Sequence, residues 1–212
     1  MKILNLYAGI GGNRKLWEGH EITAVEINPK IAEVYKTLFP EDEVVVGDAH
    51  QYLLDHFREF DFIWSSPPCQ THSRARMWAW KNSDKVESKY PDMKLYQEII
   101  FLQNYFNGQW TVENVIPYYM PLILPSYNFG RHLFWCNFII QPFNFKEADI
   151  NGGNKNEWIK LHGFDLTDIN LGQRKDQIYR NCVHPLTGEH ILNCALNIEK
   201  VTQLTLFNLQ SF

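Results

Sequence analysis

A chain of 212 residues, of which 45% are hydrophobic, is long enough for one globular domain with a substantial core. Its formal net charge of −4 argues against a protein that coats nucleic acid non-specifically, because such binding neutralises many phosphates. The four cysteines show neither a Cys-x-x-Cys pair nor a zinc spacing, so neither a disulfide framework nor a bound metal is predicted. No apolar run approaches the ~18 residues of a membrane span, and we expect a soluble, cytoplasmic protein.

Strand and helix signals alternate through the first half of the chain, which predicts an α/β fold built on a doubly wound, mostly parallel sheet. The expected strands are residues 2–7, 21–26, 43–46, 60–65, 110–115 and 133–140. The expected helices are residues 13–18, 29–39, 49–57, 95–106 and 174–180. Asn28, followed by a proline, and Asp48 are placed to cap two of these helices.

Residues 70–91 show little periodicity and are predicted to form a long loop, which inside a compact domain is usually functional. Trp78 and Trp80 lie in it. Between residues 70 and 94, six basic side chains (Arg74, Arg76, Lys81, Lys85, Lys89 and Lys94) outnumber three acidic ones (Asp84, Glu87 and Asp92). Positive charge interleaved with tryptophan suits a surface that grips a nucleic acid strand beside an extruded base. A solvated linker is the alternative.

A cysteine follows one of the predicted strands, in the sequence Ser-Ser-Pro-Pro-Cys-Gln of residues 65–70. The two prolines restrict the backbone, so Cys69 should lie on a stiff corner. A thiolate on such a corner is a candidate nucleophile. A lone buried cysteine is more often a small hydrophobic residue, so this assignment depends on the motifs around it.

Three short motifs surround this corner in a characteristic order. They are a glycine-rich turn at residues 7–13, Pro-Cys-Gln at residues 68–70 and Glu-Asn-Val at residues 113–115. Their order and spacing resemble motifs I, IV and VI of the cytosine-5 methyltransferase family, and the resemblance extends from residue 2 to about residue 192. It implies a Rossmann-like, S-adenosylmethionine-dependent methyltransferase fold and methylation of carbon 5 of cytosine in DNA.

The glycine-rich turn predicts a cofactor site, because glycines let the backbone approach a ligand closely. A dinucleotide site would require glycine where Arg14 stands, which favours S-adenosyl-L-methionine over NAD. Glu26 is placed to bind ribose hydroxyls and Asp48 an adenine amino group, although Glu26 alone would also suit a solvated strand end and Asp48 a helix cap. The expected cofactor contacts are Tyr7, Ala8, Gly9, Ile10, Gly11, Gly12, Glu26, Ile27, Asp48, Ala49, Pro68, Asn181 and Val183.

The resemblance also implies the catalytic residues. Cys69 would add to carbon 6 of the base, and Glu113 would act at N3, where negative charge develops; a surface carboxylate is the alternative for Glu113. Arg131 resembles the first arginine of motif VIII, which acts at O2 of the base. The second arginine of that motif is Leu133 here, so its contact is either made by His132 or absent. The expected nucleic acid contacts are Gln70, Ser73, Arg74, Arg76, Asn114 and His132.

The C-terminal part contains a further match and the clearest departure. Residues 181–185 resemble motif X, whose Asn181 and Val183 would close over the methionine portion of the cofactor. We predict a catalytic core at 1–141, a reduced target-recognition region at 142–172, including a turn at 151–154, and a segment returning to the core at 173–212. Only about 40 residues separate motifs VIII and X, as in short methyltransferases of phages.

The short recognition region limits what can be predicted about partners. Double-stranded DNA is the expected substrate, and specificity should be short or depend on a homodimer or a specificity partner. A cytosine-5 methyltransferase acting on RNA such as tRNA, or a non-catalytic nucleic-acid-binding relative, are the alternatives.

Overall fold

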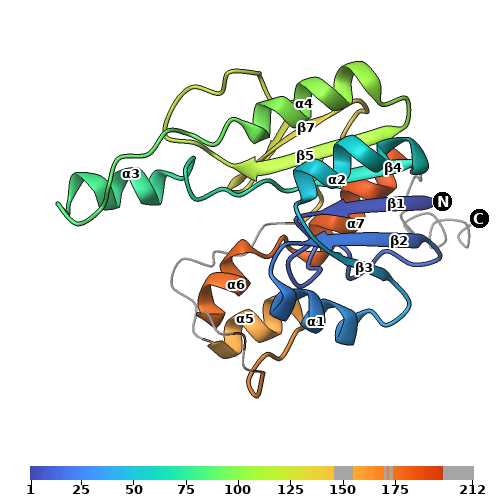
Figure 1. Ribbon diagram of the computed structural model, residues 1–212, viewed down its shortest axis with the longest axis horizontal. Helices are drawn as coiled ribbons and strands as arrows, with labels where there is room; N and C mark the ends of the chain where they lie inside the picture. Colours follow the sequence, from blue (N-terminus) through green and yellow to red (C-terminus); the bar gives the residue numbers. More distant parts are fainter. Residues whose placement is uncertain (146–154, 170, 172–173, 198–212) are drawn as a thin grey trace, which may run out of the picture.

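The computed structural model describes residues 1–145, 155–169, 171 and 174–197, and it contains a seven-stranded sheet of order β3-β2-β1-β4-β5-β7-β6 (Figure 1). The strands are β1 Lys2–Leu6, β2 Glu21–Glu26, β3 Glu43–Val46, β4 Phe62–Ser65, β5 Gln109–Val115, β6 Tyr127–Phe129 and β7 His132–Cys136. Strands β1 to β5 are parallel, whereas β7 pairs antiparallel with β5 and β6. The predicted doubly wound, mostly parallel α/β fold is confirmed.

Helices connect and cover these strands. They are α1 Pro29–Leu38, α2 Ala49–His56, α3 Arg74–Lys81, α4 Lys94–Tyr105, α5 Lys155–His162, α6 Lys175–Asn181 and α7 Pro185–Ala195, with a 3-10 turn η1 at Phe57–Glu59. The predicted caps are confirmed. The side chain of Asn28 accepts a hydrogen bond from the amide of Lys30, and that of Asp48 accepts one from the amide of His50.

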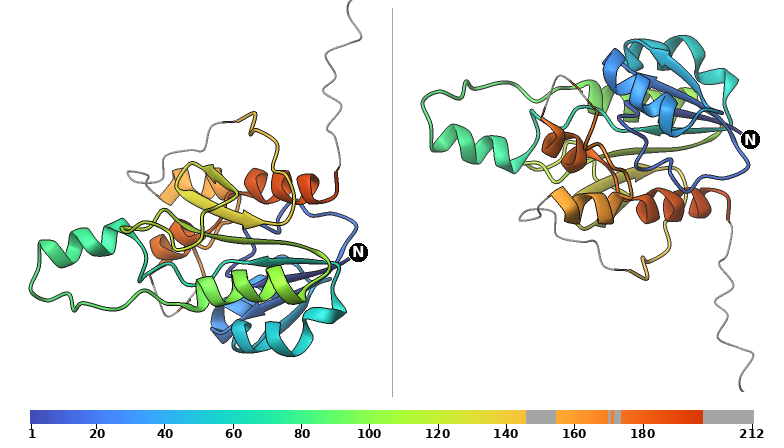
Figure 2. Two further views of the ribbon diagram at one scale, coloured as in Figure 1. Left: turned by 90° about the horizontal axis from the view of Figure 1, so that it is seen from above. Right: turned by 90° about the horizontal axis from the view of Figure 1, so that it is seen from below.

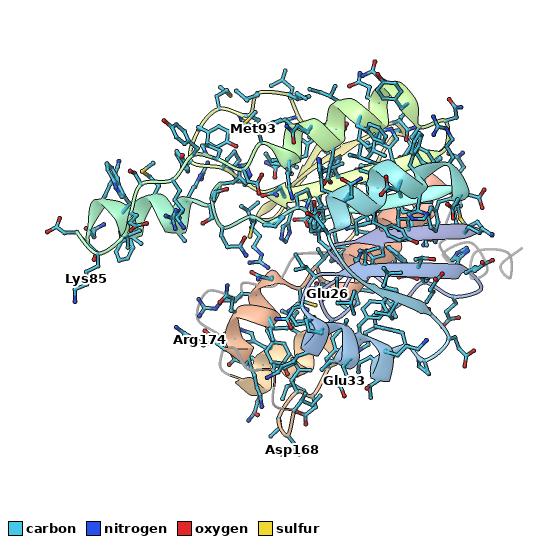
Figure 3. The ribbon with its side chains drawn as sticks, in the orientation of Figure 1. Glu26, Glu33, Lys85, Met93, Asp168 and Arg174 are labelled. Carbon is cyan, nitrogen blue, oxygen red and sulfur yellow. The ribbon has the colours of Figure 1, made fainter. Side chains whose placement is uncertain are left out.

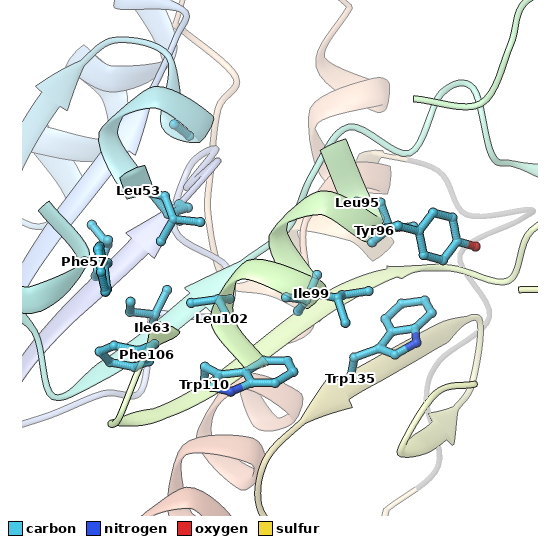
Figure 4. Close-up of a cluster of buried hydrophobic side chains, with 14 of the residues drawn as sticks. Leu53, Phe57, Ile63, Leu95, Tyr96, Ile99, Leu102, Phe106, Trp110 and Trp135 are labelled. Carbon is cyan, nitrogen blue, oxygen red and sulfur yellow. The ribbon is translucent and has the colours of Figure 1, made fainter. Parts of the chain in front are cut away.

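The sheet is buried on both faces. On one face α2 and α4 pack Leu53, Ile99 and Leu102 over the strands, together with Ile63 and Trp110 of the sheet (Figure 4). On the other face, apolar residues of α7 form a second cluster with the alternate residues of β1, β2 and β4. Burial on both faces explains why the parallel strands are almost uniformly apolar instead of alternating.

The helix expected at residues 13–18 is wrong, since this segment is a series of turns. The side chains of this segment bind partners in different parts of the protein. The amide of Asn13 pairs with that of Asn5, the guanidinium of Arg14 pairs with Asp42, and Lys15 donates to the carbonyl of His162. Trp17 is 1% exposed and packs beside Trp64. These long-range contacts override the weak local helix signal.

Two further expectations change. The loop expected at residues 70–91 contains α3, which projects from the body of the protein as an arm (Figures 1 and 2). The strand expected at 133–140 ends at Cys136, because the side chain of Asn137 takes over the pairing with the amide of Trp110. Strand β6 and helices α5 and α7 were not predicted. The turn expected at 151–154 lies outside the described residues.

Candidate functional site

The candidate site lies where the parallel strands end at their carboxyl edge. From β1 the sheet extends through β2 and β3 on one side and through β4 and β5 on the other. The loops after β1 and β4 therefore diverge at a topological switch point, where ligands bind in open α/β sheets. The amide of Ser66 donates to the carbonyl of Leu6 at 3.4 Å, so the two loops begin side by side.

The glycine-rich turn after β1 contains the close approaches that its sequence predicts. Gly9 and Gly11 have φ of +56° and +80°, a region that favours glycine. A side chain at Gly11 would strike the ring of Phe39, and one at Gly12 would strike Cys182 and the backbone of Val183. A side chain at Gly9 would meet nothing within 4 Å, so the backbone is open to a ligand at this point.

Glu26 ends β2 and holds this turn. Its carboxylate accepts hydrogen bonds from the amide of Gly9 at 3.0 Å and from the amide of Asn28 at 2.8 Å. The residue is only 8% exposed. Each carboxylate oxygen has one such partner and can accept a second bond, as a ribose diol would require. In Figure 3 the side chain lies near the centre of the carboxyl edge.

We expect Glu26→Ala to weaken the binding of S-adenosylhomocysteine by about 1.5 to 3 kcal/mol, the usual range for hydrogen bonds to a charged group. Isothermal titration calorimetry measures this. Glu21→Ala, at the exposed opposite end of the same strand, is the matched control and should bind like the unmodified protein. Equal affinity in both variants would remove Glu26 from the cofactor site.

Asp48 is exposed and caps α2. One carboxylate oxygen accepts from the amides of His50 at 2.8 Å and Gln51 at 3.4 Å, and the other pairs with Nζ of Lys94 at 3.2 Å. Although burial opposes the change, the hydrogen bonds from Lys94 and His50 lower the pKa of Asp48 below its ordinary value. Asp48 therefore acts as a helix cap, the alternative expected for it, and a contact between Asp48 and adenine stays a prediction.

The apolar residues predicted to touch the cofactor divide into two groups. Ala8, Ile10 and Ala49 are 7%, 2% and 2% exposed, so their side chains belong to the core. Ile27, at 68% exposure, and Pro68 lie on the surface near the carboxyl edge. Only this second group presents side chains that a ligand can cover without rearrangement.

The corner after β4 is held from several directions. The buried amide of Asn114 donates to the carbonyl of Pro67 at 2.9 Å and accepts from the amide of Val115. The carbonyl of Cys69 accepts from the amides of His72 and Ser73 at 3.0 and 3.1 Å. Asn114 is 1% exposed, so the structure gives it a role in positioning this corner.

Two charges of opposite sign act on the Cys69 thiol. Burial and the negative charge of Glu113 raise the pKa of the thiol to about 11, while the positive charge of Arg131 opposes the increase. The structure thus brings together the three predicted catalytic residues. The thiol is half-buried and Glu113 is 6% exposed, so their interaction is little screened by solvent.

Glu113 and Arg131 have partners on neighbouring elements. His132 of β7 places its Nε2 3.5 Å from Oε1 of Glu113, beside the cross-strand pair of Val115 and His132. Arg131 donates to the carbonyl of Arg180 in α6. His132 is 4% exposed, so its geometry suits orientation of Glu113 more than contact with a large ligand.

The segment after α6 lies against the glycine-rich turn. The close approach of Gly12 to Cys182 and Val183 places this part of the chain against the end of the glycine-rich turn. Val183 is buried at 6% exposure and Asn181 is exposed at the end of α6. Val183 and apolar residues of α7 pack in one core cluster with the sheet. The contact of Asn181 and Val183 with the cofactor stays a prediction.

The arm that contains α3 carries the remaining predicted contacts. Gln70 and Arg74 are exposed, and Ser73 caps the helix by accepting from the amide of Arg76 at 3.2 Å. None of the α3 side chains is buried. Trp78, at 69% exposure, presents a large apolar side chain to solvent, and Lys85 lies at the outer end of the arm, far from Glu26 (Figure 3).

One buried carboxylate of the site was missed. Glu98 in α4 is 0% exposed and accepts hydrogen bonds from Tyr7, His50 and Ser65. The sequence contains a signal that could have identified Glu98. A glutamate among Leu95, Ile99 and Leu102 stands on the apolar face of a predicted helix, where a charge must find partners.

Comparisons with known proteins agree with this geometry. Residues 1–101 match the family model described as C-5 cytosine-specific DNA methylase. This part of the chain is similar to the cytosine-5 methyltransferase family. The match includes the glycine-rich turn, Glu26, Asp48 and the Cys69 corner, whereas Glu113, Arg131 and Asn181 lie beyond it.

Individual relatives cover the same part of the chain. A tRNA (cytosine(38)-C(5))-methyltransferase of Spodoptera frugiperda is 34% identical over 94 residues, which is 41% of this chain and 28% of that relative. The human tRNA (cytosine(38)-C(5))-methyltransferase is 33% identical over 81 residues, 35% of this chain and 21% of its own length. The chain therefore spans less than a third of the length of either relative.

Similar solved structures include a Spodoptera frugiperda DNMT2 variant, with 31% identity, a TM-score of 0.40 and coverage of 54% of this chain and 35% of that chain. A TehB-like SAM-dependent methyltransferase of Corynebacterium glutamicum has 20% identity, a TM-score of 0.33 and coverage of 54% of each chain.

The methyl donor of the cytosine-5 methyltransferase family is S-adenosylmethionine, and the residues present fit it. The open backbone at Gly9 and the free acceptor capacity of Glu26 lie together at the switch point.

Among the described residues, no cluster of three or more His, Cys, Asp or Glu side chains could hold a metal ion. Within the same part of the chain, no helix has the length and apolar character needed to cross a membrane.

Proposed function

We propose that this protein methylates carbon 5 of cytosine in DNA, with S-adenosylmethionine as the methyl donor. The observation that carries the proposal is the thiol of Cys69, held on a fixed corner where it is acted on by Glu113 and Arg131. Carbon 5 of cytosine is not nucleophilic until a group adds to carbon 6, and a thiolate is both a good nucleophile and a good leaving group.

The residues divide the chemistry between them. The Cys69 thiolate forms a bond to carbon 6 while Glu113 gives a proton or a hydrogen bond to N3, where negative charge develops. Arg131 offsets the negative charge near the thiol. S-adenosylmethionine, when bound, supplies an electrophilic methyl group to carbon 5. Loss of the carbon 5 proton to a base, elimination of the Cys69 thiolate and return of any N3 proton to Glu113 then restore the neutral aromatic ring.

The cofactor is assigned to the glycine-rich turn and the strand ends beside it. Gly9 allows the backbone to approach the ligand, Glu26 would bind the ribose hydroxyls and Asp48 would contact the adenine. Asn181 and Val183 are assigned to its methionine portion. Because Glu26 already fixes the amide of Gly9, the turn is organised before the cofactor binds.

The target base must leave its stack to reach Cys69, which lies inside a corner and not on a protruding surface. The α3 arm is assigned to the nucleic acid strand around the extruded base. It combines exposed tryptophans with basic side chains, the composition typical of stacking platforms. Part of its charge is already engaged, since Arg76 donates to the carbonyl of Glu87.

RNA is the second candidate substrate, because the curated relatives named above are tRNA methyltransferases. Incubation of the purified protein with S-adenosylmethionine carrying a labelled methyl group, and with either double-stranded DNA or tRNA, tests both. We expect label in 5-methylcytosine of DNA, identified by nucleoside mass spectrometry. Label in tRNA alone would replace the proposed substrate, and label on an amino nitrogen would replace the proposed chemistry.

We expect Trp78→Ala and Trp80→Ala each to weaken nucleic acid binding about 5- to 150-fold, because base stacking on an aromatic side chain contributes roughly 1 to 3 kcal/mol. Fluorescence anisotropy with a labelled oligonucleotide measures this. Tyr105→Ala is the matched control, since Tyr105 is 63% exposed but ends α4 at the opposite edge of the sheet. Equal losses in all three variants would show that the arm has no special role.

A further inference from the structure

Glu98 is a buried carboxylate that joins the two halves of the site. It lies in α4 with 0% exposure and accepts hydrogen bonds from Tyr7 Oη at 2.6 Å, Ser65 Oγ at 2.5 Å and His50 Nδ1 at 2.9 Å. A buried carboxylate is tolerated only when such partners replace water.

The three partners begin different parts of the site. Tyr7 follows β1 and opens the glycine-rich turn with φ of +56°, a conformation that costs energy for a residue other than glycine. Ser65 ends β4 and lies four residues before Cys69. His50 lies in the first turn of α2, two residues after Asp48. One carboxylate therefore touches the cofactor turn, the nucleophile loop and the helix capped by Asp48.

We propose that Glu98 is a positioning residue that couples occupation of the cofactor site to the position of the Cys69 corner. The inference rests on the proposed function, because it assigns the turn to the cofactor and Cys69 to the base. Tyr7 and Ser65 bind opposite oxygens of the same carboxylate, so a movement of Tyr7 on cofactor binding turns the group that holds Ser65. The path consists of two short hydrogen bonds to the carboxylate, that of Tyr7 part-buried and that of Ser65 buried.

The coupling makes Cys69 responsive to the cofactor before any base is present. Both loops also share the contact between the amide of Ser66 and the carbonyl of Leu6, but that bond is long at 3.4 Å. Glu98 supplies the shorter and more buried connection. A protein built this way orders its nucleophile when the methyl donor is in place, which limits unproductive addition to cytosine.

Alkylation of Cys69 by iodoacetamide, with and without saturating S-adenosylhomocysteine and followed by mass spectrometry of the Cys69 peptide, tests the coupling. In the unmodified protein we expect the ligand to change the alkylation rate at least about 5-fold. Glu98→Gln keeps the size of the side chain and removes its charge, and should reduce the change to less than 2-fold. Ser65→Ala removes only the bond on the Cys69 side and should do the same, which provides a second variant if Glu98→Gln fails to fold.

Asp42→Asn is the matched control. Asp42 is also a buried carboxylate, at 2% exposure, that accepts from the hydroxyl of Tyr35 at 2.8 Å and pairs with Arg14 after the glycine-rich turn, but none of its hydrogen bonds reaches residues 65–73 of the Cys69 corner. It should keep the full ligand response even where it lowers the melting temperature. Calorimetry on each variant measures the ligand affinity separately. Where a variant binds S-adenosylhomocysteine more weakly, the ligand concentration is raised until the site is saturated.

Two results would overturn the inference. A folded Glu98→Gln or Ser65→Ala variant with the response of the unmodified protein would show that this carboxylate does not connect the sites. Unmodified protein that binds S-adenosylhomocysteine without any change at Cys69 would show that the sites are not coupled. Absence of ligand binding to the unmodified protein would instead overturn the proposed function, and the inference with it.

Discussion

Cys69→Ser is expected to lower methyl transfer by at least about 10³-fold, because a hydroxyl is a far weaker nucleophile than a thiolate of the same shape. Binding of S-adenosylhomocysteine should stay within about 2-fold, since the side chain keeps its size and the backbone bonds of Cys69 to His72 and Ser73 are retained. Single-turnover kinetics with labelled cofactor measure the first effect and calorimetry the second. Cys136→Ser, at the other edge of the sheet, is the control and should remain active.

Trapping of the covalent intermediate provides a second test of Cys69 as the nucleophile. DNA with 5-fluorocytosine at a methylated site should form a covalent complex through Cys69, because fluorine cannot leave as a proton does. Denaturing electrophoresis should show a slower band that requires the cofactor and is absent from Cys69→Ser. Methylation within tenfold of the unmodified rate in Cys69→Ser would contradict the covalent mechanism.

The parts of this fold that could be predicted are those decided by neighbouring residues. The bounds of β2 and β3 follow from short apolar runs, and the start of α1 follows from Asn28 with its proline. Asp48 was recognised as a possible cap because its side chain acts on amides two and three residues later. These interactions are local, so no knowledge of the fold was needed.

The parts that could not be predicted depend on contacts between distant residues. The turns at 13–18 are fixed by Asp42 and by the carbonyl of His162, and no local pattern contains these partners. The partners of Glu98 stand 91, 48 and 33 residues away along the chain. Helix α3 has no buried residue, so its apolar periodicity is absent. The corner that carries Cys69, the proposed nucleophile, can therefore be predicted from sequence, whereas the distant groups that position it cannot.

Glu113→Gln is expected to have two opposite effects on Cys69. Methyl transfer should fall by about 10²- to 10⁴-fold, the usual contribution of general acid catalysis, because the amide cannot protonate N3. The intrinsic reactivity of the thiol should rise. Burial and the charge of Glu113 raise the pKa of Cys69 to about 11, so removal of that charge lowers the pKa and increases the thiolate fraction at any pH below it.

The pH dependence of iodoacetamide alkylation at Cys69 measures the second effect. With a pKa of about 11, only about one thiol in a thousand is ionised at pH 8. Each unit by which the pKa falls raises the thiolate fraction about tenfold and the alkylation rate about 3- to 4-fold, because a less basic thiolate is a weaker nucleophile. Glu113→Asp is the control, because it retains the charge and should keep the profile shifted to high pH. Substitution of Arg131 by Gln should move the profile in the opposite direction, since its charge lowers the pKa of the thiol. An unchanged alkylation profile in Glu113→Gln would show that this carboxylate does not act on Cys69, and the assignment of Glu113 to the base would lose its structural support.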